Sequence, residues 1–118
     1  MKNNCATNFP SNFPELLINS GKSLEHLGIL EIAWNWKNAI RVVEFLCMQK
    51  YVILGGDVYE FKDDNLHTTY DSWYINKDRK QNEQEFIEET KKKSISYINQ
   101  YYKQKGENFY YSIVFDKM

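Results

Sequence analysis

Residues 51–61 read Tyr-Val-Ile-Leu-Gly-Gly-Asp-Val-Tyr-Glu-Phe. β-Branched and aromatic residues fill both ends of this stretch, and such residues fit a pleated, largely buried surface, so the pattern predicts a central strand. Gly55 and Gly56 interrupt it, although glycine weakens a strand by roughly 0.5–1 kcal/mol per residue relative to alanine. A glycine pair at this position indicates a bulge, a bend, or the close approach of a large neighbour such as Trp34 or Trp73.

Asp57 follows the glycine pair directly. A carboxylate in an apolar strand has to be paired or hydrogen-bonded where it is buried. We therefore expect donors inside the fold to satisfy Asp57, so that replacing it with alanine lowers the unfolding midpoint. The alternative is a functional carboxylate, whose loss removes a ligand or partner and leaves the midpoint unchanged.

The composition is that of one globular domain over residues 1–118, with irregular chain over residues 1–13. Hydrophobic residues make up 42% of the chain and aromatic residues 16%. Fifteen basic and sixteen acidic residues leave a net charge of −1, which provides no general field for nucleic acid or an anionic membrane. No apolar segment is long enough to span a membrane, and two scattered cysteines form no disulfide framework, so we expect a cytoplasmic protein.

Two long helices are predicted. The first runs from Asn35, a capping residue, to Lys50, with apolar residues at helical spacing. The second runs from Glu83 to Lys105, with acidic residues first and basic residues last, as the helix dipole favours. Gly106 ends it.

A hairpin loop is predicted over residues 62–67, followed by a partner strand, Thr68–Ile75, and a last strand, Phe109–Phe115. Residues 29–34 are ambiguous and are taken as extended. The connections place the last strand antiparallel beside the glycine-bearing strand. The expected fold class is α+β: a small, mainly antiparallel sheet of three or four strands, with Tyr51–Phe61 in the centre, packed against two main helices.

No complete catalytic or metal-binding pattern is present. The two histidines, His26 and His67, stand apart from any nucleophile and carboxylate in sequence, and no zinc-like ligand spacing or phosphate-binding loop occurs. The Gly-Gly-Asp sequence lacks the acidic residue that follows it in diguanylate cyclases. We therefore expect no catalytic residue, metal or cofactor.

The predicted hairpin brings several carboxylates close to aromatic residues. The carboxylates are Asp57, Glu60, Asp63, Asp64 and Asp71, and the aromatic residues are Tyr59, Tyr70, Trp73 and Tyr74. Three interpretations stay open: an ordinary solvated hairpin, a protein-recognition surface, or carboxylates that perform acid–base chemistry or hold a divalent cation.

Several segments in one order carry a family resemblance: Leu27-Gly28-Ile29, Glu31-Ile32-Ala33-Trp34, Ile53-Leu54-Gly55-Gly56-Asp57-Val58-Tyr59 and Tyr70-Asp71-Ser72-Trp73-Tyr74. From about Leu24 to Phe115 the chain resembles the immunity protein 40 family of bacterial polymorphic toxin systems. The family often has asparagine where this chain has Ser72. The resemblance implies a cytoplasmic, non-enzymatic antidote that binds and neutralises a cognate protein toxin, and it does not identify the toxin.

Residue roles follow from combining the resemblance with the hairpin. The expected toxin-binding residues are Tyr59, Asp63, Asp64, Tyr70 and Tyr74, and the expected structural motif is Trp34, Gly55, Gly56, Asp57, Asp71 and Trp73. The polar face of the Glu83–Lys105 helix is an alternative contact surface. Self-association stays open, because the Thr68–Ile75 strand lies at a sheet edge. The alternative function is a small enzyme or a ligand- or metal-binding domain that uses Asp57 and the hairpin carboxylates.

Overall fold

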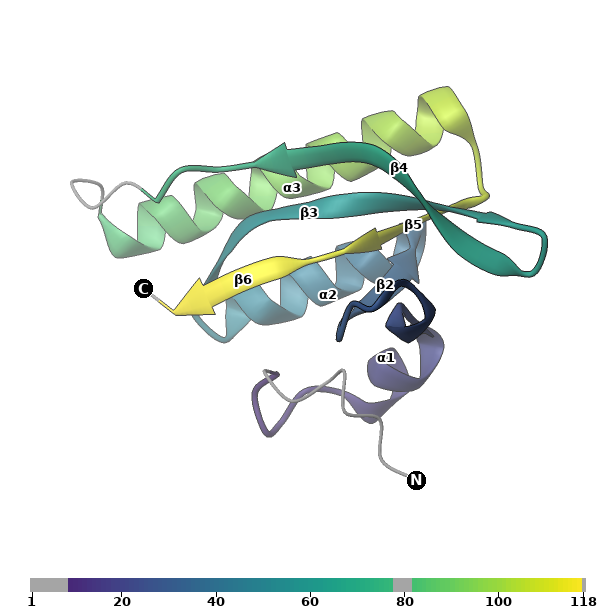
Figure 1. Cartoon of the computed structure of the whole chain (residues 1–118). Helices are drawn as coiled ribbons and strands as arrows, with labels where there is room; N and C mark the ends of the chain where they lie inside the picture. The colour runs from purple at the N-terminus through teal and green to yellow at the C-terminus, as the bar shows by residue number, and fades with distance from the viewer. Residues whose placement is uncertain (1–8, 78–81, 118) are drawn as a thin grey trace.

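The computed structural model describes residues 9–77 and 82–117, which form an α+β fold (Figure 1). In chain order, the elements are α1 Glu15–Ser20, β1 Lys22–Ser23, the 3-10 turn η2 Glu25–Leu27, β2 Ile32–Asn35, α2 Trp36–Met48, β3 Tyr51–Lys62, β4 Asn65–Tyr74, α3 Glu83–Lys105, β5 Phe109–Ser112 and β6 Val114–Lys117. Residues 9–13 form neither helix nor strand, and the first eight residues lie outside the described part. None of the helices described is long and apolar enough to cross a membrane.

β3 is the central strand, as predicted. It pairs with β4 on one side and with β5 and β6 on the other, antiparallel in each case. The strand order is β1-β2-β5-β3-β4, with β6 beside the first half of β3. The crossover through α3 therefore returns the last part of the chain to the side of β3 away from β4, as the connection rules indicate.

The sheet has six strands in the described part of the chain, which corrects the expected three or four. β1 has only two residues, too few for a recognisable sequence pattern. The predicted last strand is divided at Ile113 into β5 and β6. Just past this break, the pairing of β3 with β6 shifts register between Ile53↔Phe115 and Gly55↔Val114, so β3 carries one extra residue against β6. The glycine pair thus marks a β-bulge, one of the features that glycine in a strand indicates.

The hairpin turn is tighter than the predicted loop over residues 62–67. Only Asp63 and Asp64 connect β3 to β4, with φ values of +54° and +64°. Two successive positive φ angles are typical of the type I′ turn, whose twist matches that of the flanking strands. β4 consequently begins at Asn65 rather than at Thr68.

Asparagine side chains start both long helices. The side chain of Asn35 accepts a hydrogen bond from the Asn38 N–H (3.0 Å), and that of Asn82 accepts one from the Glu85 N–H (3.1 Å). Each bond satisfies an N–H that has no partner within the first helical turn. The α3 bounds match the prediction.

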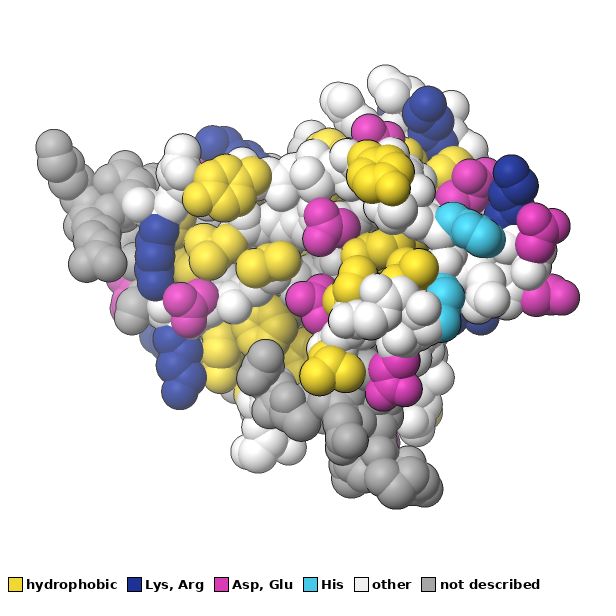
Figure 2. Space-filling model, viewed as in Figure 1, with side chains coloured by type: hydrophobic (Ala, Val, Ile, Leu, Met, Phe, Trp, Pro, Cys, Tyr) yellow, Lys and Arg dark blue, Asp and Glu magenta, His cyan; other side chains and the backbone are white. Residues whose placement is uncertain are grey.

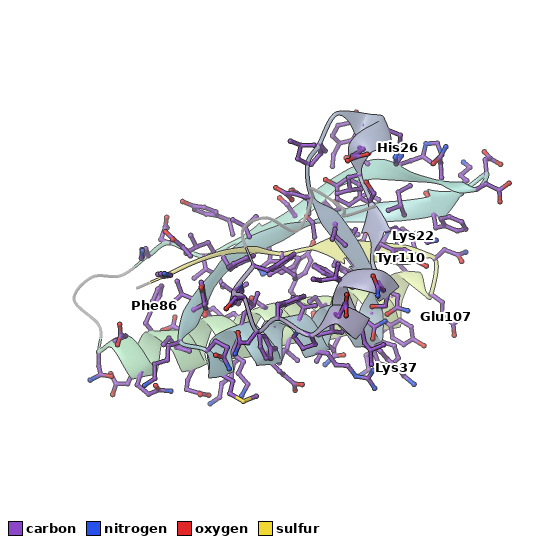
Figure 3. All side chains as sticks on the ribbon, turned by 90° about the horizontal axis from the view of Figure 1, so that it is seen from below. Lys22, His26, Lys37, Phe86, Glu107 and Tyr110 are labelled. Carbon is purple, nitrogen blue, oxygen red and sulfur yellow. The ribbon has the colours of Figure 1, made fainter. Side chains whose placement is uncertain are left out.

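α2 and α3 cover one face of the sheet and enclose the main core (Figures 1 and 3). Val43 and Leu46 of α2, Ile98 of α3, and Val58 and Tyr111 of the sheet are all fully buried there. The Trp36 ring stacks on Tyr102 at 3.8 Å and ties the two helices together.

A smaller cluster lies on the opposite face. It consists of Leu24, Ala33, Tyr59 and Leu66, with Ile29, Phe61 and Tyr110 packed around it. The segment from Leu24 to Ile29 covers it, and a His26 ring nitrogen lies 2.8 Å from the Leu66 carbonyl oxygen. Figure 3 shows His26 on the side of the sheet away from the helices, over the β3–β4 hairpin. Among residues 9–77 and 82–117, a chain segment covers this face in this way only at its hairpin end.

Candidate interaction surface

Asp71 and Trp73 attach β4 to α3. The Trp73 Nε1–H donates to Ser94 Oγ (3.0 Å), and the Trp73 ring stacks on Tyr97 with centroids 4.9 Å apart. Two residues earlier, Asp71 Oδ2 accepts a hydrogen bond from the Tyr101 hydroxyl (2.8 Å). Burial and the Asp71 carboxylate raise the pKa of Tyr101 to about 12. The Asp-x-Trp sequence therefore has a structural position, on the helix side of the sheet.

The glycine pair makes room for this arrangement. A Cβ on Gly56 would collide with the Trp73 ring and with the Ser112 carbonyl oxygen. Gly55 has a φ of +145°, and a Cβ there would meet the Trp73 carbonyl oxygen. The expectation of a large neighbour is thus confirmed for Trp73. Trp34 lies elsewhere, buried against α1, where its Nε1–H donates to the Leu17 carbonyl (2.6 Å).

The expectation that Asp57 is satisfied inside the fold is wrong. Gly56 and Val58 face the helices, so Asp57 points to the opposite face, where its side chain is exposed. The Asp57 carboxylate accepts no hydrogen bond from the residues that the structure describes, and only its backbone N–H bonds, to Ser112 Oγ (3.3 Å). The sequence pattern around Asp57 was interpreted as a strand buried on both faces. In the structure, this part of β3 is buried on the side of the helices and exposed at Asp57 on the other side.

Tyr59, predicted as an exposed contact residue, is only 4% exposed. It points to the same face as Asp57 but lies under Leu24. Burial raises the pKa of Tyr59, and the carboxylates of Asp57 and Glu31 raise it further. Tyr59 therefore belongs to the smaller cluster and is corrected as a surface residue.

Tyr70 and Tyr74 are exposed, at 88% and 78%. Tyr70 sits where the β3–β4 register shifts and has a φ of +67°. A left-handed conformation costs a non-glycine residue about 1–2 kcal/mol. Thr68 and Thr69 hold it, because their Oγ1 atoms accept the N–H groups of Tyr70 and Asp71 (both 3.1 Å). The bulge thus presents the Tyr70 ring to solvent.

The hairpin does not gather the predicted carboxylates. Asp63 and Asp64 are exposed at the turn, whereas Asp57 pairs with Ser72, five residues back along β3 from Lys62. At ~3.3 Å per residue, this spacing is about 17 Å. Asp71 points to α3 instead. No cluster of three or more His, Cys, Asp or Glu suited to a metal ion occurs within residues 9–77 and 82–117.

Sequence reasoning missed a surface on the uncovered half of the sheet. Val114 and Tyr74 flank Gly55 from opposite sides, because each pairs with it. With Leu30, Glu31 and Asp57 they form what we call the open-face surface, where Leu30 is 69% and Val114 41% exposed. Figure 2 shows hydrophobic and acidic side chains together on this face. This surface can be recognised only when the pairing of the strands is known. The sequence alone therefore carries no signal for Leu30 or Val114.

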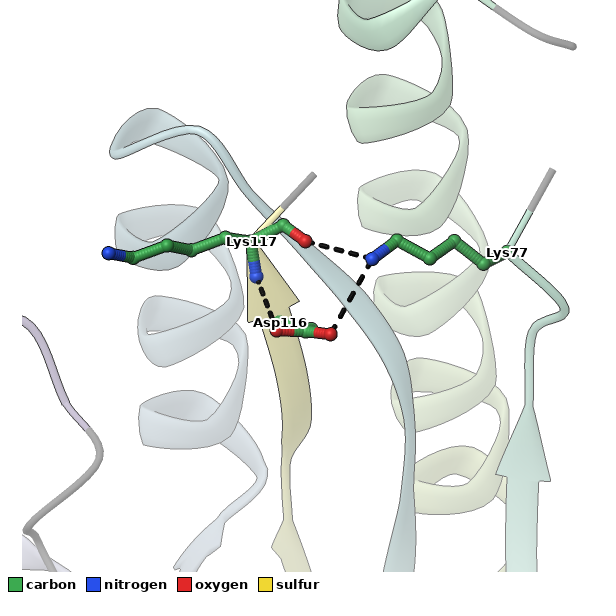
Figure 4. A network of polar contacts seen from close by, with 3 residues as sticks. All are labelled: Lys77, Asp116 and Lys117. Carbon is green, nitrogen blue, oxygen red and sulfur yellow. Dashed lines mark hydrogen bonds and ion pairs between the residues drawn. The ribbon is translucent and has the colours of Figure 1, made fainter. Parts of the chain in front are cut away.

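Glu31 and Asp57 give the open-face surface a negative charge. Burial raises the pKa of Glu31, and the Asp57 carboxylate raises it further. No described cation forms an ion pair with either group. Lys77, which also lies at this end of the sheet, is engaged elsewhere: its Nζ contacts Asp116 Oδ2 (3.5 Å) and the Lys117 carbonyl oxygen (2.9 Å) (Figure 4).

A pocket of about 400 Å³ opens beside the surface. Residues 30–32 form one wall and residues 113–117 the other, with Trp34 and Tyr51 also lining it. The arrangement offers apolar contact area, aromatic rings and unpaired carboxylates on one side of the molecule. Such a combination suits recognition of another protein.

Comparison with known protein families finds a match. The sequence model of the family described as immunity protein 40 matches residues 23–115. No curated protein and no solved structure matches the chain. The match covers most of the chain, including β2 to β5 and both long helices. The chain therefore belongs to the immunity protein 40 family.

Proposed function

We propose that this protein binds one cognate bacterial toxin and neutralises it by protein–protein contact, with no turnover of its own. The observation that carries the proposal is the family match over residues 23–115. Members of an immunity family protect the cell that makes them, so we place the protein in the cytoplasm, where a toxin delivered from a neighbouring cell would act.

The open-face surface supports a protein partner. Leu30, Tyr74 and Val114 are exposed on one face, and none of the described helices lies over them. Single exposed apolar residues are ordinary, but a group of them bordered by charged residues marks an interaction site. Tyr74 supplies the aromatic anchor, a type of residue that dominates binding energy in protein interfaces. Tyr70 provides a second exposed ring on the same strand.

The alternative surface on α3 is less suited to this role. None of the large exposed hydrophobic side chains in the described residues belongs to α3. Its exposed positions are mainly charged, and Lys93 pairs there with Glu89 at 2.8 Å. Solvated pairs of this kind contribute ~0–1 kcal/mol and do not anchor a partner.

Asp63 and Asp64 occupy a different position, at the exposed hairpin tip. We retain them as residues that steer a basic toxin surface toward the protein. Such charges mainly raise the association rate, and salt screens them. Asp63→Lys with Asp64→Lys should therefore slow association at low salt by about tenfold, with little change at high salt. Stopped-flow mixing at two ionic strengths measures this, and Glu83→Lys with Glu85→Lys on α3 is the matched charge-reversal control.

Co-expression with the toxin encoded beside this gene tests the function itself. The intact protein should restore growth, and the purified pair should form a one-to-one complex. Failure to restore growth, together with heat stabilisation of the protein by a metabolite, would refute the antidote proposal and favour a ligand-binding domain.

A further inference from the structure

β6 has a strand on only one side. It pairs with β3 from Tyr51↔Lys117 to Gly55↔Val114. On its other side, the β2–β5 pairing stops at Ala33↔Ser112. No backbone group of the described residues outside β3 bonds to the backbone of residues 114–117. Side chains engage both backbone groups of Lys117: its N–H donates to Asp116 Oδ1 (2.8 Å) and its C=O accepts from Lys77 Nζ (2.9 Å). The described residues therefore leave the outward backbone groups of residues 114–116 available to another chain.

Residues 30–32, which precede the part of β2 that pairs with β5, do not pair with β6. Residues before Ala33 pair with β1 through Ser23↔Ile32, and the Leu24 N–H donates to the Glu31 carbonyl oxygen (3.0 Å). This pairing pulls residues 30–32 toward β1 and leaves the pocket of about 400 Å³ between them and β6. Paired strands lie ~4.8 Å apart, and four residues of β6 span about 13 Å, so an added strand of similar length matches the edge.

The opposite edge of the sheet, formed by β4, is less suited to accept an added strand. At the β4 edge, the Tyr70 bulge shifts the register and interrupts a regular ladder. Bulges of this kind blunt edges against further pairing. The β6 edge has a bulge only at its start, where the register with β3 shifts between Val114 and Phe115 and the extra residue lies on β3. From Phe115 to Lys117 the register runs without a shift.

Three charged residues line the pocket: Glu31 on one wall, and Asp116 and Lys117 on the other. Asp116 pairs with Lys77, whereas no ion pair among the described residues engages Glu31, which leaves Glu31 for a basic group of the occupant. The apolar lining comes from Trp34, Tyr51 and Phe115, with the Phe9 ring stacked on Phe115 (centroids 5.3 Å apart), and it suits a side chain with an aliphatic stem. A lysine or arginine meets both requirements, because its stem packs on apolar surface and its head remains charged.

We propose that β6 receives an extended segment of the toxin as an added antiparallel or parallel strand, with a basic side chain of that segment directed to Glu31. The inference rests on the proposed function, because it takes the partner to be the cognate toxin. Main-chain hydrogen bonds would provide affinity and the pocket would provide selectivity, as in other cases of strand addition.

Amide hydrogen exchange tests the added strand. The probe is the toxin domain against which the intact protein restores growth, and exchange is measured on the free protein and on the complex. Outward amides of residues 114–116 should exchange at least about tenfold more slowly in the complex, whereas those of residues 99–105 in α3, outside the proposed interface, should not change.

Side-chain variants test the charge and the position. Leu30→Lys places a cation beside Glu31 and should weaken toxin binding at least about tenfold, as competition with the partner's basic group requires. Leu16→Lys is the matched control, because Leu16 is an exposed leucine on α1 (83% against 69% for Leu30), and it should bind as the parent does. Glu31→Gln should also weaken binding and reduce its salt dependence.

The outcomes separate the two proposals. A parent protein that binds no toxin contradicts the proposed function. Binding with unchanged exchange at residues 114–116 refutes the added strand and leaves the function standing. Protection of these amides in the free protein would also refute the added strand. Protection that increases with protein concentration would identify a second copy of the chain on the β6 edge. Protection that does not depend on concentration would mean that another part of the same chain already occupies the edge.

Discussion

Asp57 and Tyr59 lie two residues apart on β3 and point to the same face of the sheet, yet Asp57 is exposed and Tyr59 is 4% exposed. The difference arises because the Leu24–Ile29 segment crosses only the hairpin end of that face. The covered half is a small second core, whereas the open half keeps carboxylates and apolar groups in solvent. Alternation along a strand decides where a side chain points, but a distant segment decides whether that direction leads to core or surface.

Two leucines give the largest contrast between the halves. Leu24 is fully buried and Leu30 is 69% exposed. Leu24→Ala should lower the free energy of unfolding by about 2–5 kcal/mol, because it removes buried apolar contacts and leaves a cavity. Leu30→Ala should change it by less than about 0.5 kcal/mol. Urea unfolding of both variants measures the contrast, and equal losses would mean that the open half is also part of the core.

Tyr74 tests the open half as a binding surface. Tyr74→Ala should weaken toxin binding by about 2 kcal/mol, as expected for an aromatic anchor, with no change in unfolding. Tyr59→Ala should do the reverse, because it opens the second core while leaving the surface largely intact. Isothermal titration and thermal melts on the two variants separate these roles. A stable Tyr74→Ala protein with the parent's affinity would exclude Tyr74 from the interface.

Glu31→Gln should give the smallest effect, which is a change in how the stability of the fold depends on pH. Its pKa is raised in the folded protein, so its contribution to stability is complete below the unfolded pKa and is lost as pH rises through the folded pKa. Glu31→Gln avoids that loss and should be more stable than the parent at pH 7, by less than about 1 kcal/mol for a group this accessible. The advantage should vanish at pH 3. Melting curves at both pH values measure it, with Glu44→Gln on α2 as the control.

An advantage of Glu31→Gln that persists at pH 3 would show that packing, and not charge, separates the two proteins. The same variant is predicted above to bind toxin less well. A gain in stability with a loss of binding is the expected sign of a carboxylate placed for a partner rather than for the fold.

Local patterns were sufficient for the long elements. The capping position of Asn35, the charge order of α3 and the β-rich composition of β3 each depend on neighbours in sequence, and these elements were predicted correctly. Patterns in neighbouring residues did not predict which part of the sheet is covered by another segment of the chain. Asp57 was misplaced because the pattern around Gly55 and Gly56 resembles a strand buried on both faces, and exposure at that point depends on where Leu24 folds.

The site was predictable only in part. Tyr70 and Tyr74 are exposed as expected, although their role stays a prediction. The left-handed conformation of Tyr70 has no signal in Thr-Thr-Tyr-Asp, because all four residues are compatible with a regular strand. Leu30 and Val114 line the same pocket although they lie far apart in the sequence. Such proximity depends on register, which a single sequence does not fix.

The position of β5 has a consequence for the order in which the chain assembles. β2 joins the sheet only by pairing with β1 and β5, and β5 separates it from β3. The β3–β4 hairpin can form while synthesis continues, since its contacts are local. β1 and β2 must wait until residues 109–112 have left the ribosome. Residues 109–117, which are made after α3, therefore complete both walls of the pocket, so a chain that stops before them lacks the pocket proposed to receive the toxin.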